Sequence, residues 1–125
     1  MSMIVSVAAG GALGALSRWG MSLAVTRLMG HGFPWATLSV NVLGSIAMGM
    51  LIGWLSKYDQ GYTLLRHAAV IGFLGSFTTF STFSLDIVVL AERGAWTQAM
   101  LYGVSSFALA VGGLVAGLHL MRAVA

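Results

Sequence analysis

Residues 76–84, in mid-chain, combine six hydroxyl side chains with three phenylalanines. They lie inside an otherwise apolar stretch and follow two glycines, Gly72 and Gly75. In lipid every backbone polar group needs a partner, so a polar segment preceded by glycine must face protein, a cavity or an ion path. We therefore expect the functional site of this chain to lie here.

We expect the helix that carries this run to break between Gly75 and Thr79. Glycines weaken a helix, and the hydroxyls of Thr78 and Thr79 can cap a restarted one. A break exposes carbonyl groups that can bind a monovalent cation and N–H groups that favour an anion. The alternative is an unbroken helix in which Ser and Thr hydroxyls bond back to the preceding turn.

Phe80 and Phe83 are three residues apart and fall on roughly one helix face. Such a stripe is typical of packing against lipid or a neighbouring helix. In a second interpretation the electropositive ring edges hold an anion, and Ser81 and Thr82 donate hydrogen bonds as the anion sheds water. Both interpretations stay open at this point.

Four further polar residues lie in apolar stretches. The amide of Asn41 must find a partner, either an anion or another helix. Tyr102 and Ser106 are four residues apart and share a helix face. Arg18 could extend its charge to the membrane surface or lend positive potential to a water-filled vestibule.

Several kinds of site are missing from the sequence. The chain has no cysteine, and its three histidines lack metal-ligand spacing. No catalytic triad, P-loop or dinucleotide motif is present. The six Lys and Arg residues form no basic cluster, so the high pI does not indicate nucleic acid. We expect neither an enzyme nor a nucleic-acid-binding protein.

The elements that must position these residues are membrane spans. Of the 125 residues 58% are hydrophobic and 7% are charged, against about 25% charged in soluble domains. Four apolar stretches each exceed the roughly 20 residues needed to cross a bilayer. The first is expected to be a span rather than a cleaved signal peptide, because it lacks a basic leading segment. We predict an all-α membrane protein, a single four-helix transmembrane domain over residues 1–125, with spans at 3–25, 33–55, 67–91 and 95–121 and a break in the third.

The positive charges are nearly balanced between the two ends of this bundle. Lys57, Arg66 and Arg122 fall on one side, and Arg27 and Arg93 on the other. Topology follows the Lys and Arg imbalance of short loops, so we predict insertion in both orientations and an antiparallel homodimer. The alternative is that one extra charge suffices to fix a single orientation.

Glycines spaced four apart predict close helix packing, because small residues let backbones approach in a membrane. With 17 glycines in the chain, we expect a tight bundle rather than a wide pore. The pairs are Gly10 and Gly14, Gly49 and Gly53, and Gly113 and Gly117.

Three motifs, in this order, resemble the CrcB/Fluc family of fluoride channels over essentially the full chain. They are GGALGALSR at 10–18, TLSVNVLGS at 37–45 and GFLGSFTTFSTFS at 72–84. The resemblance implies an antiparallel dual-topology homodimer with two separate fluoride pores. It also implies a structural sodium ion at the dimer centre, held by the backbone carbonyls of Gly75 and Thr78 from both subunits.

The resemblance also assigns pore residues. Phe80 and Phe83 match the fluoride-lining phenylalanines of the family, and Asn41 matches its pore asparagine. A second helix-four hydroxyl of some members is Ala110 here. The remaining matches are Ser81 and Thr82 for the hydroxyl track, Tyr102 and Ser106 for helix four, and Arg18 near the vestibule.

The function implied is passive, fluoride-selective export. Hydrogen fluoride crosses membranes neutral and dissociates inside, and the channel lets the trapped anion leave the cytoplasm across the inner or plasma membrane. A different class is a small dual-topology proton-coupled exporter, but its expected intramembrane carboxylate is missing from the first, second and fourth stretches. A third possibility is a membrane assembly subunit without transport.

Overall fold

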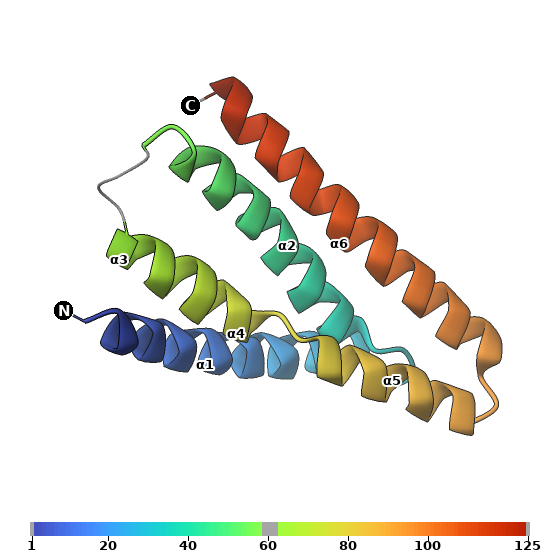
Figure 1. Cartoon of the computed structure of the whole chain (residues 1–125). Coiled ribbons are helices and arrows are strands. Elements are labelled where there is room, and N and C mark those ends of the chain that lie inside the picture. Colours follow the sequence, from blue (N-terminus) through green and yellow to red (C-terminus); the bar gives the residue numbers. More distant parts are fainter. Residues whose placement is uncertain (1, 59–62, 125) are drawn as a thin grey trace.

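The computed structural model describes residues 2–58 and 63–124, and every regular element in that part is helical. The helical segments run up and down in one bundle (Figure 1). The predicted all-α class is confirmed, whereas part of the predicted connection at 56–62 lies outside the described residues. The elements are α1 (Met3–Met29), α2 (Trp35–Leu55), α3 (Thr63–Arg66), the π-helix η1 (His67–Leu74), α4 (Gly75–Phe77), α5 (Phe80–Glu92) and α6 (Trp96–Val124).

The helix ends follow from local chemistry. The Ser2 hydroxyl accepts from the N–H of Val5 and caps α1. Gly30 and Gly94 have φ values of 80° and 77°, a conformation in which glycine carries no side-chain penalty. They turn the chain after α1 and after α5.

Three helical segments are long and apolar enough to cross a membrane: Trp35–Leu55, Thr63–Glu92 and Trp96–Val124. The protein is therefore a multi-pass membrane protein. Helix α1 is 27 residues long but carries Arg18 and Arg27, and it does not meet the same criterion of apolarity. Its crossing of the membrane stays a prediction.

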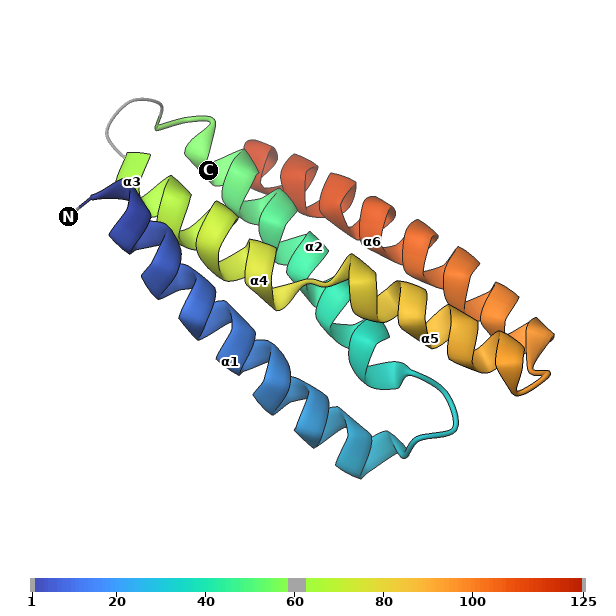
Figure 2. The same cartoon turned by 60° about the horizontal axis from the view of Figure 1, so that its bottom comes forward.

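The third segment is split into two halves that pack on different neighbours. Helices α3, η1 and α4 follow one another and lie along α1, whereas α5 lies along α6. Figure 2 shows the extended link between α4 and α5 beside α2. The split therefore places a non-helical piece of backbone inside the bundle.

Close helix contacts depend on glycine, as the sequence predicts. At Gly49 on α2, an added Cβ would meet the carbonyl oxygen of Leu114 on α6. At Gly14 on α1, it would lie on the carbonyl oxygen of Phe73 in η1 and 2.9 Å from that carbonyl carbon. Backbone in direct contact leaves no room for a methyl group, so these glycines set the spacing of the helices.

We expect Gly14→Ala to destabilise the protein by about 1–3 kcal/mol, because the new methyl group would overlap backbone that cannot move aside. Thermal unfolding in detergent measures the effect. Gly20→Ala is the control on the same helix, since no atom lies within 4 Å of the added Cβ. Equal melting temperatures for the two variants would contradict the packing described here.

Candidate ion site at the helix break

The break consists of two consecutive extended residues. Thr78 has φ −85° and ψ 155°, and Thr79 has φ −151° and ψ 116°. The prediction of a break between Gly75 and Thr79 is thus confirmed, but Gly75 itself is helical, with φ −62° and ψ −33°. The threonines rather than the glycines leave the helix. Thr79 then caps α5, because its hydroxyl accepts from the N–H of Thr82 at 3.2 Å.

A side chain from α2 holds the extended backbone. The Asn41 Nδ2 group donates to the carbonyl oxygen of Thr79 at 3.0 Å, and the Thr79 N–H donates to Asn41 Oδ1 at 2.7 Å. One amide therefore satisfies both main-chain groups of Thr79, as the neighbouring strand of a sheet would. We call this pair of hydrogen bonds the Asn41 clamp. An amide has two N–H donors, so one N–H of Asn41 is left for another acceptor.

At the break, two backbone N–H groups donate to side chains instead of to the carbonyl groups four residues earlier. In a continuous helix, the N–H of Thr79 would bond to the carbonyl of Gly75 and that of Thr82 to the carbonyl of Thr78. Here the first donates to Asn41 and the second to the Thr79 hydroxyl. The carbonyls of Gly75 and Thr78 thereby lose their helical partners.

An apolar groove opens beside the break between α5 and α6, with a volume of about 590 Å³. We call it the break cavity. Ser106 is 6% exposed, and its hydroxyl lacks a partner among the described residues. Phe80 is 78% exposed at the edge of this groove. The lining residues used below are Asn41, Thr78, Thr79, Phe80, Phe83, Ser106, Phe107 and Ala110.

A second, more polar cavity lies on the other side of the break, towards α1. It has a volume of about 230 Å³ and is lined by Arg18, Thr37, Thr79 and Thr82, among others. We call it the arginine cavity. Thr79 lines both cavities, so the capped start of α5 is the wall between them. Arg18 thus faces the break rather than only the membrane surface.

The phenylalanine pair leads to a buried tyrosine. The rings of Phe80 and Phe83 have centroids 5.5 Å apart, and those of Phe83 and Tyr102 are 5.1 Å apart. Tyr102 is fully buried, and its hydroxyl donates to Asp86 Oδ2 at 2.9 Å. The aromatic stripe predicted on α5 therefore continues into α6 and ends at a carboxylate.

The structure brings most of the predicted site residues together, but not all of them. Asn41, Phe80, Phe83 and Ser106 line the break cavity with Thr78, and Arg18 and Thr82 line the arginine cavity. The hydroxyl of Ser81 lies 3.3 Å from that of Thr79. Ser81, Tyr102 and Gly75 line neither cavity, although Tyr102 contacts Phe83 and Gly75 begins the turn before the break.

Comparison with known proteins decides the family. A profile described as CrcB-like protein, Camphor Resistance (CrcB), matches residues 5–118. This chain belongs to the CrcB family. The family resemblance of the three motifs is thereby confirmed.

Relatives within the CrcB family match over nearly their whole length. A protein of Rhodospirillum centenum is 50% identical over 98% of this chain and 97% of its own. A protein of Roseobacter denitrificans is 48% identical over 99% of this chain and 98% of its own. A protein of Sphingopyxis alaskensis is 45% identical over 98% of this chain and 97% of its own. All three carry the name fluoride-specific ion channel FluC. The family is thus one of ion channels, a non-enzymatic class of proteins, which confirms the expectation that this chain is no enzyme.

Two features of this CrcB site were not assigned from the sequence. Thr79 was expected to cap a helix, but not to be the backbone partner of Asn41. The hydrogen bond between Tyr102 and Asp86 was not predicted either. The hint for both lay in the rule that a lone polar side chain in an apolar helix needs a partner.

We expect Asn41→Asp and Asn41→Ala to loosen the break, because an ionised aspartate cannot donate to the carbonyl of Thr79 and alanine can neither donate nor accept. Losing the clamp is worth about 1–3 kcal/mol, or roughly 10- to 100-fold faster amide exchange locally. Hydrogen–deuterium exchange on a peptide spanning the break measures this. Ser39→Ala on the same helix is the control, and wild-type exchange in both Asn41 variants would contradict the clamp.

Proposed function

We propose that this protein is a passive, fluoride-selective channel that lets fluoride leave the cytoplasm across the cell membrane. The observation that carries the proposal is the buried, unpaired hydroxyl of Ser106, a residue that lines a groove together with three phenylalanines, Phe80, Phe83 and Phe107. Buried polar groups are normally paired, so this donor suits a small anion that arrives without its water. Relatives such as the 50% identical protein of Rhodospirillum centenum, which is named a fluoride-specific ion channel, support the choice of ion.

The groups that line the break cavity could hold an anion through hydrogen-bond donors and aromatic ring edges, without a positively charged side chain among the described residues of the cavity. Asn41 on α2 and Ser106 on α6 both line this groove and both carry hydrogen-bond donors. The ring edges of Phe80 and Phe83 are electropositive. On the other side of the break, Arg18 adds positive potential, and the hydroxyls of Thr82 and Ser81 extend the donors along α5. Ala110 also lines the groove, at the position where the family resemblance implies a second helix-four hydroxyl in some members.

We propose that the working unit is an antiparallel homodimer. A single copy leaves Phe80 78% exposed and Phe107 73% exposed along the break cavity. A second, inverted copy would cover this face and complete the pore on its side. The near balance of positive charges between the two ends of the bundle favours insertion in both orientations.

We further propose a structural sodium ion at the dimer centre, held by the carbonyls of Gly75 and Thr78 from both copies. The diversion of the N–H groups of Thr79 and Thr82 supports this, because it frees these two carbonyls as ligands. Unwound carbonyls in a membrane protein are suited to monovalent cations. The ion would offset the cost of leaving them unpaired.

Purified protein reconstituted into liposomes should release fluoride passively, without a proton gradient. We expect Phe80→Ile and Asn41→Asp each to slow this release by at least about tenfold while the dimer stays intact, because each removes a group that contacts the anion. Phe73→Ile is the matched control, since Phe73 stacks on Phe77 and lines neither cavity. Silent wild-type liposomes, or cation uptake that depends on a proton gradient, would contradict the proposal.

Fluoride release should require sodium but not divalent cations. Replacing sodium by a large organic cation should abolish the flux of the purified dimer or dissociate it, whereas a divalent chelator should leave both unchanged. The physical reason is that the unpaired carbonyl oxygens of the break need a cation of the right charge and size to coordinate. A dimer that stays fully active after rigorous removal of sodium would refute the ion, but not the channel.

A further inference from the structure

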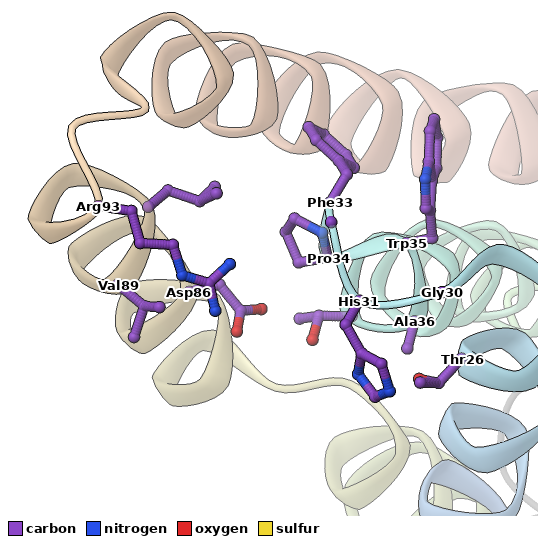
Figure 3. A pocket seen from close by; sticks show the side chains of 13 residues that line it. Thr26, Gly30, His31, Phe33, Pro34, Trp35, Ala36, Asp86, Val89 and Arg93 are labelled. Atoms are coloured by element: carbon purple, nitrogen blue, oxygen red, sulfur yellow. The ribbon is translucent and has the colours of Figure 1, made fainter.

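A third cavity lies at the end of the bundle where α1 turns into α2 and α5 turns into α6. We call it the end cavity; its volume is about 220 Å³. Figure 3 shows the side chains of His31, Asp86 and Arg93 around this one space. His31 comes from the α1–α2 loop, Asp86 from the middle of α5 and Arg93 from the end of α5. His31 and Arg93 are exposed and lie in the two connections between helices, at the end of the bundle that we expect at a membrane surface.

The end cavity adjoins the polar path to the break. Thr37 is 8% exposed and lines both the end cavity and the arginine cavity. The arginine cavity in turn shares Thr79 with the break cavity. The end cavity and the arginine cavity are therefore neighbours, with Thr37 as a lining residue that both share.

The charge of the end cavity depends on one imidazole. The ionisable side chains that line it are His31, Asp86 and Arg93. The carboxylate of Asp86 is held in place by the hydroxyl of Tyr102 at 2.9 Å. With His31 neutral, the charges of Asp86 and Arg93 cancel; with His31 protonated, the cavity carries one net positive charge. Histidine is the side chain type whose charge changes between about pH 5 and 8.

We propose that the end cavity is a collecting site for a small hydrated anion, and that protonation of His31 switches it on. This inference rests on the proposed fluoride function and adds a site and a regulation to it. A protonated His31 attracts anions to the mouth of the path, and a neutral one leaves only the cancelling pair. Fluoride would then reach the break faster from an acidic solution.

The test is passive fluoride efflux from liposomes at low fluoride, with equal pH on both sides. One unit charge several ångströms from the ion, seen through water, changes the local anion concentration by about two- to threefold. We expect the wild-type rate to be about two- to threefold higher near pH 6 than near pH 8. Protein-free vesicles measure the leak of hydrogen fluoride, which is subtracted.

Variants of His31 separate this site from other titrating groups. His31→Asn should give the slower rate at both pH values, and His31→Lys the faster rate at both. Arg93→Gln should lower the rate at both pH values and keep the pH dependence. His119→Asn is the control, because His119 lies near the far end of α6 and lines none of the three cavities; it should behave as wild type.

The electrostatic origin has its own signature. Raising the concentration of an impermeant salt should shrink the ratio of rates between the two pH values, because salt screens exposed charges. Efflux with equal wild-type rates at both pH values, or pH dependence that survives in His31→Asn, would overturn this inference alone. No fluoride efflux from the wild type at any pH would contradict the proposed function itself, and this site with it.

Discussion

The amide of Asn41 makes a helix break possible inside a membrane protein. Away from water, a backbone N–H or C=O without a partner costs several kcal/mol, so an extended residue in a span must find both partners nearby. The side chain of Asn41 on the neighbouring helix bonds both main-chain groups of Thr79, at 2.7 and 3.0 Å, and the Thr79 carbonyl also faces the first turn of α5, which Thr79 caps. The break is therefore a property of two helices, α2 and the split third segment, rather than of the 76–84 run alone.

The split gives each half of the third segment its own partner. The π-helix η1 packs on α1 through a backbone contact at Gly14, and α5 packs on α6 through Phe83 and Tyr102. The extended link at Thr78 and Thr79 is the place where these two packings meet. Three cavities follow one another around it, joined by Thr37 and Thr79. Hydroxyls, the amide of Asn41, the charges of Arg18 and Arg93 and the carboxylate of Asp86 are among the polar groups that line these cavities.

Composition and local chemistry were enough to predict the helical bundle, the position of the break to within a few residues, and the capping role of threonine. They were not enough to choose between the glycines and the threonines as the residues that leave the helix. Gly72 stays helical while it packs against α1, where a Cβ would lie 3.0 Å from the Cα of Gly10, and Gly75 is helical as well. Nor could the sequence pair Asn41 with Thr79 or Asp86 with Tyr102. These contacts span 38 and 16 residues, and which helix faces meet is decided by tertiary packing rather than by local periodicity.

An experimental density map of the purified protein in its membrane assembly tests the central claim most directly. The account predicts that Thr78 and Thr79 are extended, with the side-chain amide of Asn41 lying against both main-chain groups of Thr79. A third segment that runs as one unbroken helix from Gly75 to Phe83, with Asn41 turned elsewhere, would contradict it.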